Sequence, residues 1–157
     1  SAHLVIIGGS AERMAQYQRY WDEISGAERV HFIGPRPVGA LAGYLKQADV
    51  LVSPRSDGVN TPLKIYSYLD SGRPVVATDL PTHNQVLHSG IAKLAAAEPG
   101  AFAKAIDAIL GDKDASMKMA DEAKDFIARE HSPEAFNTRV HELYGRIEKV
   151  VTSAGSG

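Results

Sequence analysis

Residues 53–78 read SPRSDGVNTPLKIYSYLDSGRPVVAT, and this stretch decides the expected fold. It combines the exit of a strand, a polar loop, a helix over residues 62–70 and a further strand over residues 74–77. Thr61 suits the N-cap of that helix, and Pro62 suits its first position, where the missing N–H of proline has no cost. The stretch therefore predicts a β-α-β unit whose helix begins just after a buried strand.

The same alternation continues on both sides of this unit. Apolar runs rich in β-branched residues predict further strands at residues 2–7, 30–33, 50–52 and 91–95. Helical spacing and helix-boundary residues predict helices at residues 38–47, 101–110, 115–128 and 133–151, and one around Met14, Tyr17, Trp21 and Ile24 that ends at Ser25-Gly26. Strands that alternate with helices predict an α/β fold, a Rossmann-like, doubly wound parallel sheet followed by C-terminal helices.

Several residues suit helix boundaries. Thr82 and Gln85 form a Thr-x-x-Gln capping box, which predicts a short helix that begins at Thr82. Asp112, directly after Gly111, suits the cap of the following helix. Ser132 suits the N-cap of the last helix, with Pro133 at its first position.

Length and composition limit the organisation of the chain. Its 157 residues, of which 44% are apolar, predict one globular domain over residues 2–151 and a disordered tail over residues 152–157. A net charge of −2 provides no positive field for nucleic acid. The absence of cysteine excludes disulfides and thiolate ligands, and no apolar run is long enough to span a membrane. We expect a cytoplasmic protein.

The helix start after Thr61 is the most informative candidate site. The free N–H groups of Leu63 and Lys64, the helix dipole and the Lys64 ammonium together predict an anion site that suits a phosphate or pyrophosphate. Gly58 and Asn60 in the preceding loop allow close backbone approach and unusual φ values. The alternative, a well-capped connecting helix with a solvated Lys64, stays open.

The run from Asp57 to Thr78 resembles the donor-binding signature of GT-B glycosyltransferases of the retaining group 1 or family 4 type. Landmarks at residues 4–9, 30–34 and 48–54 are similar to strands of that family in the same order, and the resemblance covers roughly residues 2–130. It implies the C-terminal, nucleotide-sugar-binding half of a GT-B enzyme, which transfers a sugar to an unknown acceptor. The N-terminal acceptor domain and the first βα unit of the donor domain would be missing, and the fragment alone would be inactive.

The resemblance also implies roles for individual residues. The helix start, Thr61 to Lys64, would bind the diphosphate, and Lys64 would act in catalysis by stabilising the leaving nucleotide. The loop from Gly58 to Asn60 would lie against the donor sugar, and the loop from Gly34 to Arg36 near the base. Independently of the resemblance, the position of Arg55 in the chain places it closer than Arg36 to the predicted anion site. Family members generally need no catalytic metal, so we expect no cofactor beyond the nucleotide-sugar substrate. The full-length enzyme would be cytoplasmic, with a peripheral position at the inner membrane face as a variant of that expectation.

The sequence departs from the family at two glutamates that stand eight positions apart. Their positions fall on Val59 and on Ser67, which would lie near the ribose, and Asp57 is the nearest loop carboxylate for a catalytic role. This departure keeps open a noncatalytic nucleotide-sugar-binding or interaction module. A GT-B nucleotide-sugar epimerase is the other alternative.

Four further features carry a functional and a structural interpretation. Arg36 could contact the base or phosphate, or be solvated. His83 could approach the donor, or be a surface residue of a short helix. Asp112-Lys113-Asp114 matches a metal-binding pattern of another glycosyltransferase class, but we interpret it as a helix cap. We expect Tyr17, Tyr20 and Trp21 to pack against the core rather than to stack on bases.

Overall fold

A computed structural model describes residues 2–24 and 27–154. The chain divides into two compact units, residues 1–44 and residues 45–157, and each is described by itself. The predicted helix end at Ser25-Gly26 and residues 155–157 of the predicted tail lie outside the described residues.

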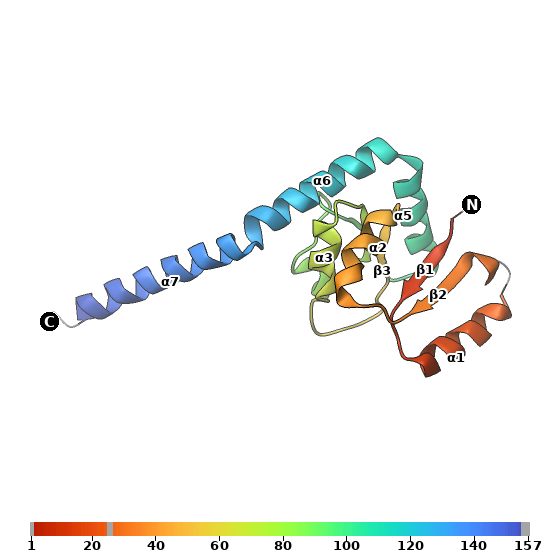
Figure 1. The fold of residues 1–157 in the computed structure, drawn as a ribbon. Coiled ribbons are helices and arrows are strands. Elements are labelled where there is room, and N and C mark those ends of the chain that lie inside the picture. The colour runs from red at the N-terminus through yellow and green to blue at the C-terminus, as the bar shows by residue number, and fades with distance from the viewer. Residues whose placement is uncertain (1, 25–26, 155–157) are drawn as a thin grey trace. The chain divides into compact units, whose positions relative to one another are not determined.

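The first unit contains a two-stranded parallel sheet (Figure 1). Strand β1 (Leu4–Ile7) pairs with β2 (Val30–Gly34), and Leu4 lies opposite Val30. The backbone N–H of Gly8 donates to the carbonyl of Gly34. The helical segments of this part of the chain are α1 (Ala11–Asp22), η1 (Ala27–Arg29), η2 (Val38–Ala40) and α2 (Leu41–Gln47), which runs across the boundary of the two units.

Two burial predictions for this unit are wrong. Val5 in the strand expected to be buried is 52% exposed, and Tyr17 and Tyr20, which were expected to pack, are 55% and 62% exposed. A strand is buried on both faces only when the sheet is covered on both sides. The described part of this unit has two strands and one long helix, α1, which itself buries no residue. The apolar pattern is therefore present, but the described unit does not bury it.

The second unit contains a three-stranded parallel sheet with the strand order β3-β4-β5. Its elements follow the predicted alternation: β3 (Leu51–Ser53), α3 (Lys64–Asp70), β4 (Val75–Thr78), α4 (Pro81–Asn84), β5 (Lys93–Ala95), α5 (Pro99–Gly111), α6 (Lys113–Glu130) and α7 (Pro133–Ala154). The predicted α/β fold with parallel strands between helices is confirmed. Helix α7 continues through residues 152–154, which were expected to belong to the tail.

Both faces of this sheet are covered. Successive side chains of a strand point to opposite faces, so Val75 and Ala77 enter one core and Val76 enters another. The first core includes Ile65 and Leu69 of α3, and the second includes residues of α5. Strand β4 is buried at every position. The helices cover the two faces of the sheet, so the carboxyl ends of β3 and β4 are free to carry the loops that follow Ser53 and Thr78.

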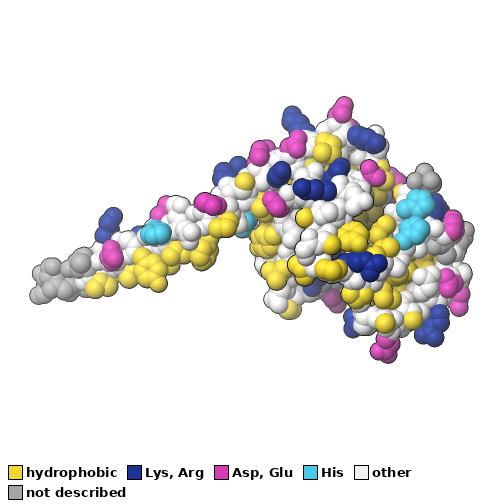
Figure 2. Space-filling view, viewed as in Figure 1, with side chains coloured by type: hydrophobic (Ala, Val, Ile, Leu, Met, Phe, Trp, Pro, Cys, Tyr) yellow, Lys and Arg dark blue, Asp and Glu magenta, His cyan; other side chains and the backbone are white. Residues whose placement is uncertain are grey.

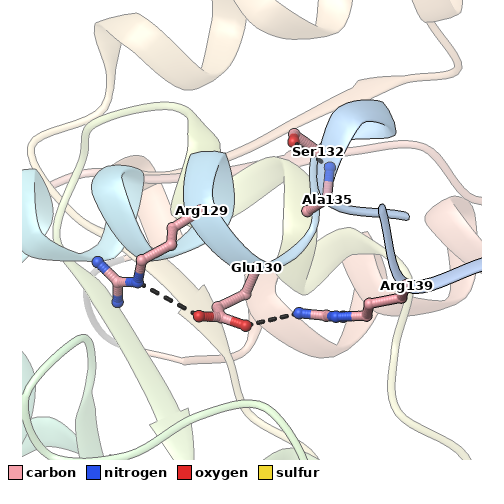
Figure 3. Close-up of polar contacts among 5 residues, drawn as sticks. All are labelled: Arg129, Glu130, Ser132, Ala135 and Arg139. Atoms are coloured by element: carbon pink, nitrogen blue, oxygen red, sulfur yellow. Dashed lines mark hydrogen bonds and ion pairs between the residues drawn. The ribbon is translucent and has the colours of Figure 1, made fainter. Parts of the chain in front are cut away.

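The junction of α6 and α7 confirms the helix cap predicted at Ser132 (Figure 3). Ser132 Oγ accepts a hydrogen bond from the N–H of Ala135 at 3.1 Å, and α7 begins at Pro133. Glu130 at the end of α6 pairs with Arg129 at 3.3 Å and with Arg139 of α7 at 2.5 Å. At the other end of α6, Asp112 Oδ1 accepts from the N–H of Ala115 at 3.0 Å, so Asp112 is a helix cap as interpreted.

Helix α7 carries exposed apolar side chains along one side, visible as a row in Figure 2. They are Phe136, Leu143, Tyr144, Ile147, Val150 and Val151. Within the described ranges, no helix has the length and apolar character that a membrane span requires.

Candidate functional site

The candidate site lies where β3 and β4 end. Ser53 and Thr78 are the last residues of these neighbouring strands, and both are buried. Arg55 follows β3, and its backbone N–H donates to Thr78 Oγ1 at 3.2 Å and to the Ser53 carbonyl at 3.1 Å. In a parallel α/β sheet this carboxyl edge is where ligands bind. The loop that leaves β3 is therefore fixed to both strands at its first turn.

The Arg55 side chain folds back over its own loop. Its Nη1 donates to the Asn60 carbonyl at 2.7 Å. Gly58 has φ +147, and a Cβ atom added there would lie 2.1 Å from Arg55 Nη2, so only glycine leaves room for the guanidinium group in this position. Of the ion pairs among the described residues, none involves Arg55. The guanidinium group thus has no carboxylate partner in the described part of the chain.

The predicted N-cap role of Thr61 is wrong. Helix α3 begins at Lys64 rather than at Pro62, and Leu63, already helical in conformation, precedes it without a side-chain cap. Thr61 Oγ1 lies instead 2.9 Å from the Thr82 carbonyl and 2.6 Å from Gln85 Oε1. The physical reason is that the fold places α4 and the residue after it beside the loop, so the Thr61 hydroxyl binds the Thr82 carbonyl and the Gln85 side chain instead of an N–H group of α3.

The start of α3 nevertheless has free donors, as predicted. The first backbone hydrogen bond of the turn joins the N–H of Ile65 to the Pro62 carbonyl at 3.0 Å. The N–H groups of Leu63 and Lys64 have no acceptor among the described residues. Unpaired N–H groups at a helix start favour an anion.

Lys64 adds a second cation. Its Nζ lies 5.6 Å from the centre of the Tyr68 ring, one helical turn further on, in the range of a cation–π contact. Partial burial of the ammonium group, and to a smaller extent the charge of Arg55, lower the pKa of Lys64. Arg55 and Lys64 form no ion pair within the described chain, so a bound anion would stabilise both charges.

The predicted capping box is also wrong. Helix α4 begins at Pro81 with Leu80 as its cap residue, so Thr82 lies inside the helix. Thr82 Oγ1 is buried and has no hydrogen-bond partner among the described residues, and the Gln85 side chain contacts Thr61 instead. Pro81, which suits the first turn of a helix, moved the helix start one residue earlier than the box predicted.

His83 is not a surface residue, because its side chain is completely buried. Its Nδ1 lies 2.8 Å from the Thr78 carbonyl, and its Nε2 lies 3.0 Å from Ser53 Oγ. A carbonyl can only accept, so Nδ1 carries the hydrogen and Nε2 accepts from the serine hydroxyl. Burial is the main cause that lowers the pKa of His83. The hydrogen bond to the Thr78 carbonyl raises this pKa, and the positive charges of Arg55 and Lys64 lower it further. His83 is therefore held neutral.

The buried, neutral state of His83 predicts a loss of stability in acid. Because the pKa is lower in the folded chain than the ordinary value of 6.5, the unfolded chain binds the proton first, and stability falls as the pH drops below 6.5 toward the folded pKa. We expect the melting temperature to fall between about pH 7 and pH 5. In the His83→Asn variant this decline should be shallower. Equal slopes for the two proteins would contradict a neutral buried His83.

The remaining predicted site residues are exposed or lie in the first unit. Asp57 is exposed in the loop after β3, and no ion pair of the described residues involves it. Ser67 is exposed on α3, one turn after Lys64, and Val59 is 88% exposed. In the first unit, Gly34 is buried with φ +76, and Arg36 Nη1 donates to the Pro35 carbonyl at 3.0 Å. Their assigned contacts with a donor stay predictions.

Three contributors to the site were not predicted from the sequence. Ser53 and Thr78 anchor the loop, and the signal that could have found them is a polar residue at the end of an otherwise apolar strand. Tyr68 lies under the Lys64 ammonium, and its spacing of four residues along a helix is the usual one for contacting side chains. Burial raises the pKa of Tyr68, so its ring stays neutral beside the cation.

The fold and the site together define a class: a parallel α/β domain with two cations and a helix start at its carboxyl edge, an arrangement found in nucleotide-binding proteins. The sequence profile of the family described as "Glycosyl transferases group 1" matches residues 1–112. The chain belongs to this group 1 glycosyltransferase family. No curated protein sequence matches it at a significant level.

Solved structures support the same fold. HepE of Anabaena in complex with UDP is similar with a TM-score of 0.77 and 16% identity, over 92% of this chain and 41% of that one. Sucrose-phosphate synthase of Thermosynechococcus elongatus is similar with a TM-score of 0.78 and 20% identity, over 94% of this chain and 39% of that one. The C-terminal domain of the group 1 protein LpcC of Francisella tularensis is similar with a TM-score of 0.69 and 16% identity, over 83% of this chain and 70% of that one. The chain spans about two-fifths of the length of the first two.

Proposed function

We propose that this chain is the C-terminal, donor-binding domain of a family 4, GT-B glycosyltransferase, and that it binds the diphosphate of a nucleotide-sugar. The observation that carries the proposal is the pair of cations Arg55 and Lys64, without a carboxylate partner in the described chain, beside free N–H groups at the carboxyl edge of a parallel sheet. Family membership provides the reaction class.

Transfer of the sugar leaves negative charge on the departing nucleoside diphosphate. Fixed positive groups placed where that charge develops stabilise the transition state. Lys64, Arg55 and the N–H groups of Leu63 and Lys64 are groups of this kind. The acceptor would be bound by a second domain of the same enzyme, and this chain alone would be inactive. The hexosyl nature of the sugar, a cytoplasmic location and the lack of a metal requirement belong to the same proposal.

UDP is the first ligand to test, because HepE of Anabaena was crystallised with UDP. We expect one nucleoside diphosphate among UDP, GDP and ADP to raise the melting temperature of the chain selectively, since a ligand that binds only the folded state stabilises it by mass action. The titrations are carried out with EDTA and repeated by calorimetry. If none of the three diphosphates or their sugar conjugates shifts the melting temperature or releases heat, the proposal fails.

A second candidate is a noncatalytic nucleotide-sugar-binding module. It is favoured by Val59 and Ser67, which leave the two glutamate positions of the resembled family without a carboxylate. The two candidates share the anion site and differ in turnover. A longer protein that includes the preceding domain would release nucleoside diphosphate in the presence of an acceptor only if the chain is part of an active transferase.

A further inference from the structure

Helix α4 holds both ends of the loop over residues 54–61. At the start of the loop, His83 of α4 bridges Ser53 and Thr78, and Thr78 Oγ1 accepts from the N–H of Arg55. At its end, Thr61 contacts the Thr82 carbonyl and the Gln85 side chain. The loop that carries Arg55 is therefore fixed at both ends by three residues of α4 and its C-terminal end, Thr82, His83 and Gln85.

His83 is the central member of this arrangement. Both ring nitrogens are used inside the protein, and the side chain has no exposed surface. It cannot touch a ligand in this state. Its imidazole joins the ends of two neighbouring strands, which fixes their spacing and the orientation of Thr78. The Thr78 hydroxyl then meets the Arg55 N–H at 3.2 Å, and it lies 3.2 Å from His83 Nδ1.

We propose that His83 is a positioning residue of the diphosphate site, which holds the backbone of Arg55 in place through Ser53 and Thr78. The proposal rests on the proposed function for its ligand. Its structural part, the fixing of loop 54–61 by His83, has a readout that needs no ligand. A residue that merely contributed to stability would not change this loop more than the rest of the chain.

Two variants remove the bridge in different ways. Ser53→Ala deletes the hydroxyl that donates to Nε2. His83→Asn keeps an amide N–H near the position of Nδ1, which can still donate to Thr78, but its side chain is too short to reach Ser53. Ser116→Ala is the matched control, because Ser116 is a buried serine of α6 whose Oγ donates to the Ile109 carbonyl at 2.9 Å, away from loop 54–61.

The first measurement is amide hydrogen exchange of the whole 157-residue chain without ligand. We expect faster exchange in residues 54–61 for Ser53→Ala and for His83→Asn, and wild-type exchange there for Ser116→Ala. The second measurement is calorimetric titration with pyrophosphate. Each bridge variant should bind it about 3- to 10-fold more weakly, the effect of one hydrogen bond. The double variant, with Ser53→Ala and His83→Asn together, should have no lower affinity for pyrophosphate than the single variant with the lower affinity, because both changes break the same bridge.

The outcomes separate the two proposals. If the wild-type chain binds UDP and pyrophosphate, while the bridge variants match Ser116→Ala in loop exchange and in affinity, the role of His83 is overturned and the proposed function stands. If the wild-type chain binds none of UDP, GDP and ADP, none of their sugar conjugates and no pyrophosphate, the proposed function fails and the diphosphate role of His83 fails with it. Faster loop exchange together with weaker pyrophosphate binding in both bridge variants supports the proposal.

Discussion

The Lys64→Ala variant is expected to bind UDP roughly 5- to 150-fold more weakly than the wild-type chain, the effect of losing a charged hydrogen bond of about 1–3 kcal/mol. The ammonium group is poised for an anion, because Arg55 beside it disfavours its charge and no carboxylate of the described chain pairs with it. A bound diphosphate removes that disadvantage. The variant should stay folded, since Lys64 contributes no apolar contact to the cores.

Calorimetric titration of both proteins at the same ionic strength measures this effect. Lys104→Ala on α5 is the matched control, because it removes the same charge from an exposed position of the same unit. We expect Lys104→Ala to bind UDP with wild-type affinity. Unchanged affinity in Lys64→Ala would exclude the phosphate role of Lys64, and an equal loss in both variants would show that only net charge matters.

The Ile65→Ala variant is expected to lower the free energy of unfolding by about 2–5 kcal/mol. Ile65 is completely buried and packs in the core cluster with Leu69 of the same helix and Val75 of β4. Its truncation removes apolar contacts and leaves a cavity between α3 and the sheet. Because Ile65 follows Lys64 directly, this core contact also fixes the start of the helix that carries the cation.

Urea unfolding followed by circular dichroism measures the difference. Leu63→Ala is the control two positions away: Leu63 is 83% exposed, so its truncation should change stability by less than about 0.5 kcal/mol. A loss below about 1 kcal/mol in Ile65→Ala would contradict the close packing of α3 on the sheet, since buried isoleucine truncations cost more.

Much of the fold was predictable because its signals are local. Apolar β-branched runs and helical spacing gave the order of strands and helices, and Asp112 and Ser132 cap the helices for which they were predicted. A helix cap joins residues three positions apart, so the sequence contains both partners. The N–H groups at the start of α3 were predictable for the same reason.

The burial of the first unit was not predictable from its pattern. The run around Val5 and the aromatic spacing of α1 indicate surfaces that suit a core, yet Tyr17 and Tyr20 are exposed in the described structure. An apolar pattern shows which face can be buried, but burial needs a covering layer, and that layer comes from other elements.

The sequence by itself determined the alternation of strands and helices, the family signature between Asp57 and Thr78, and the cation at the start of α3. Only the tertiary structure decided the partners of the polar side chains. Thr61 does not cap α3 as predicted; its hydroxyl contacts Gln85, which is 24 residues away along the chain. His83 became the buried link between two strand ends. A hydroxyl or imidazole binds whichever donor or acceptor the fold brings within about 3 Å, and residues distant in sequence meet only after the chain has folded.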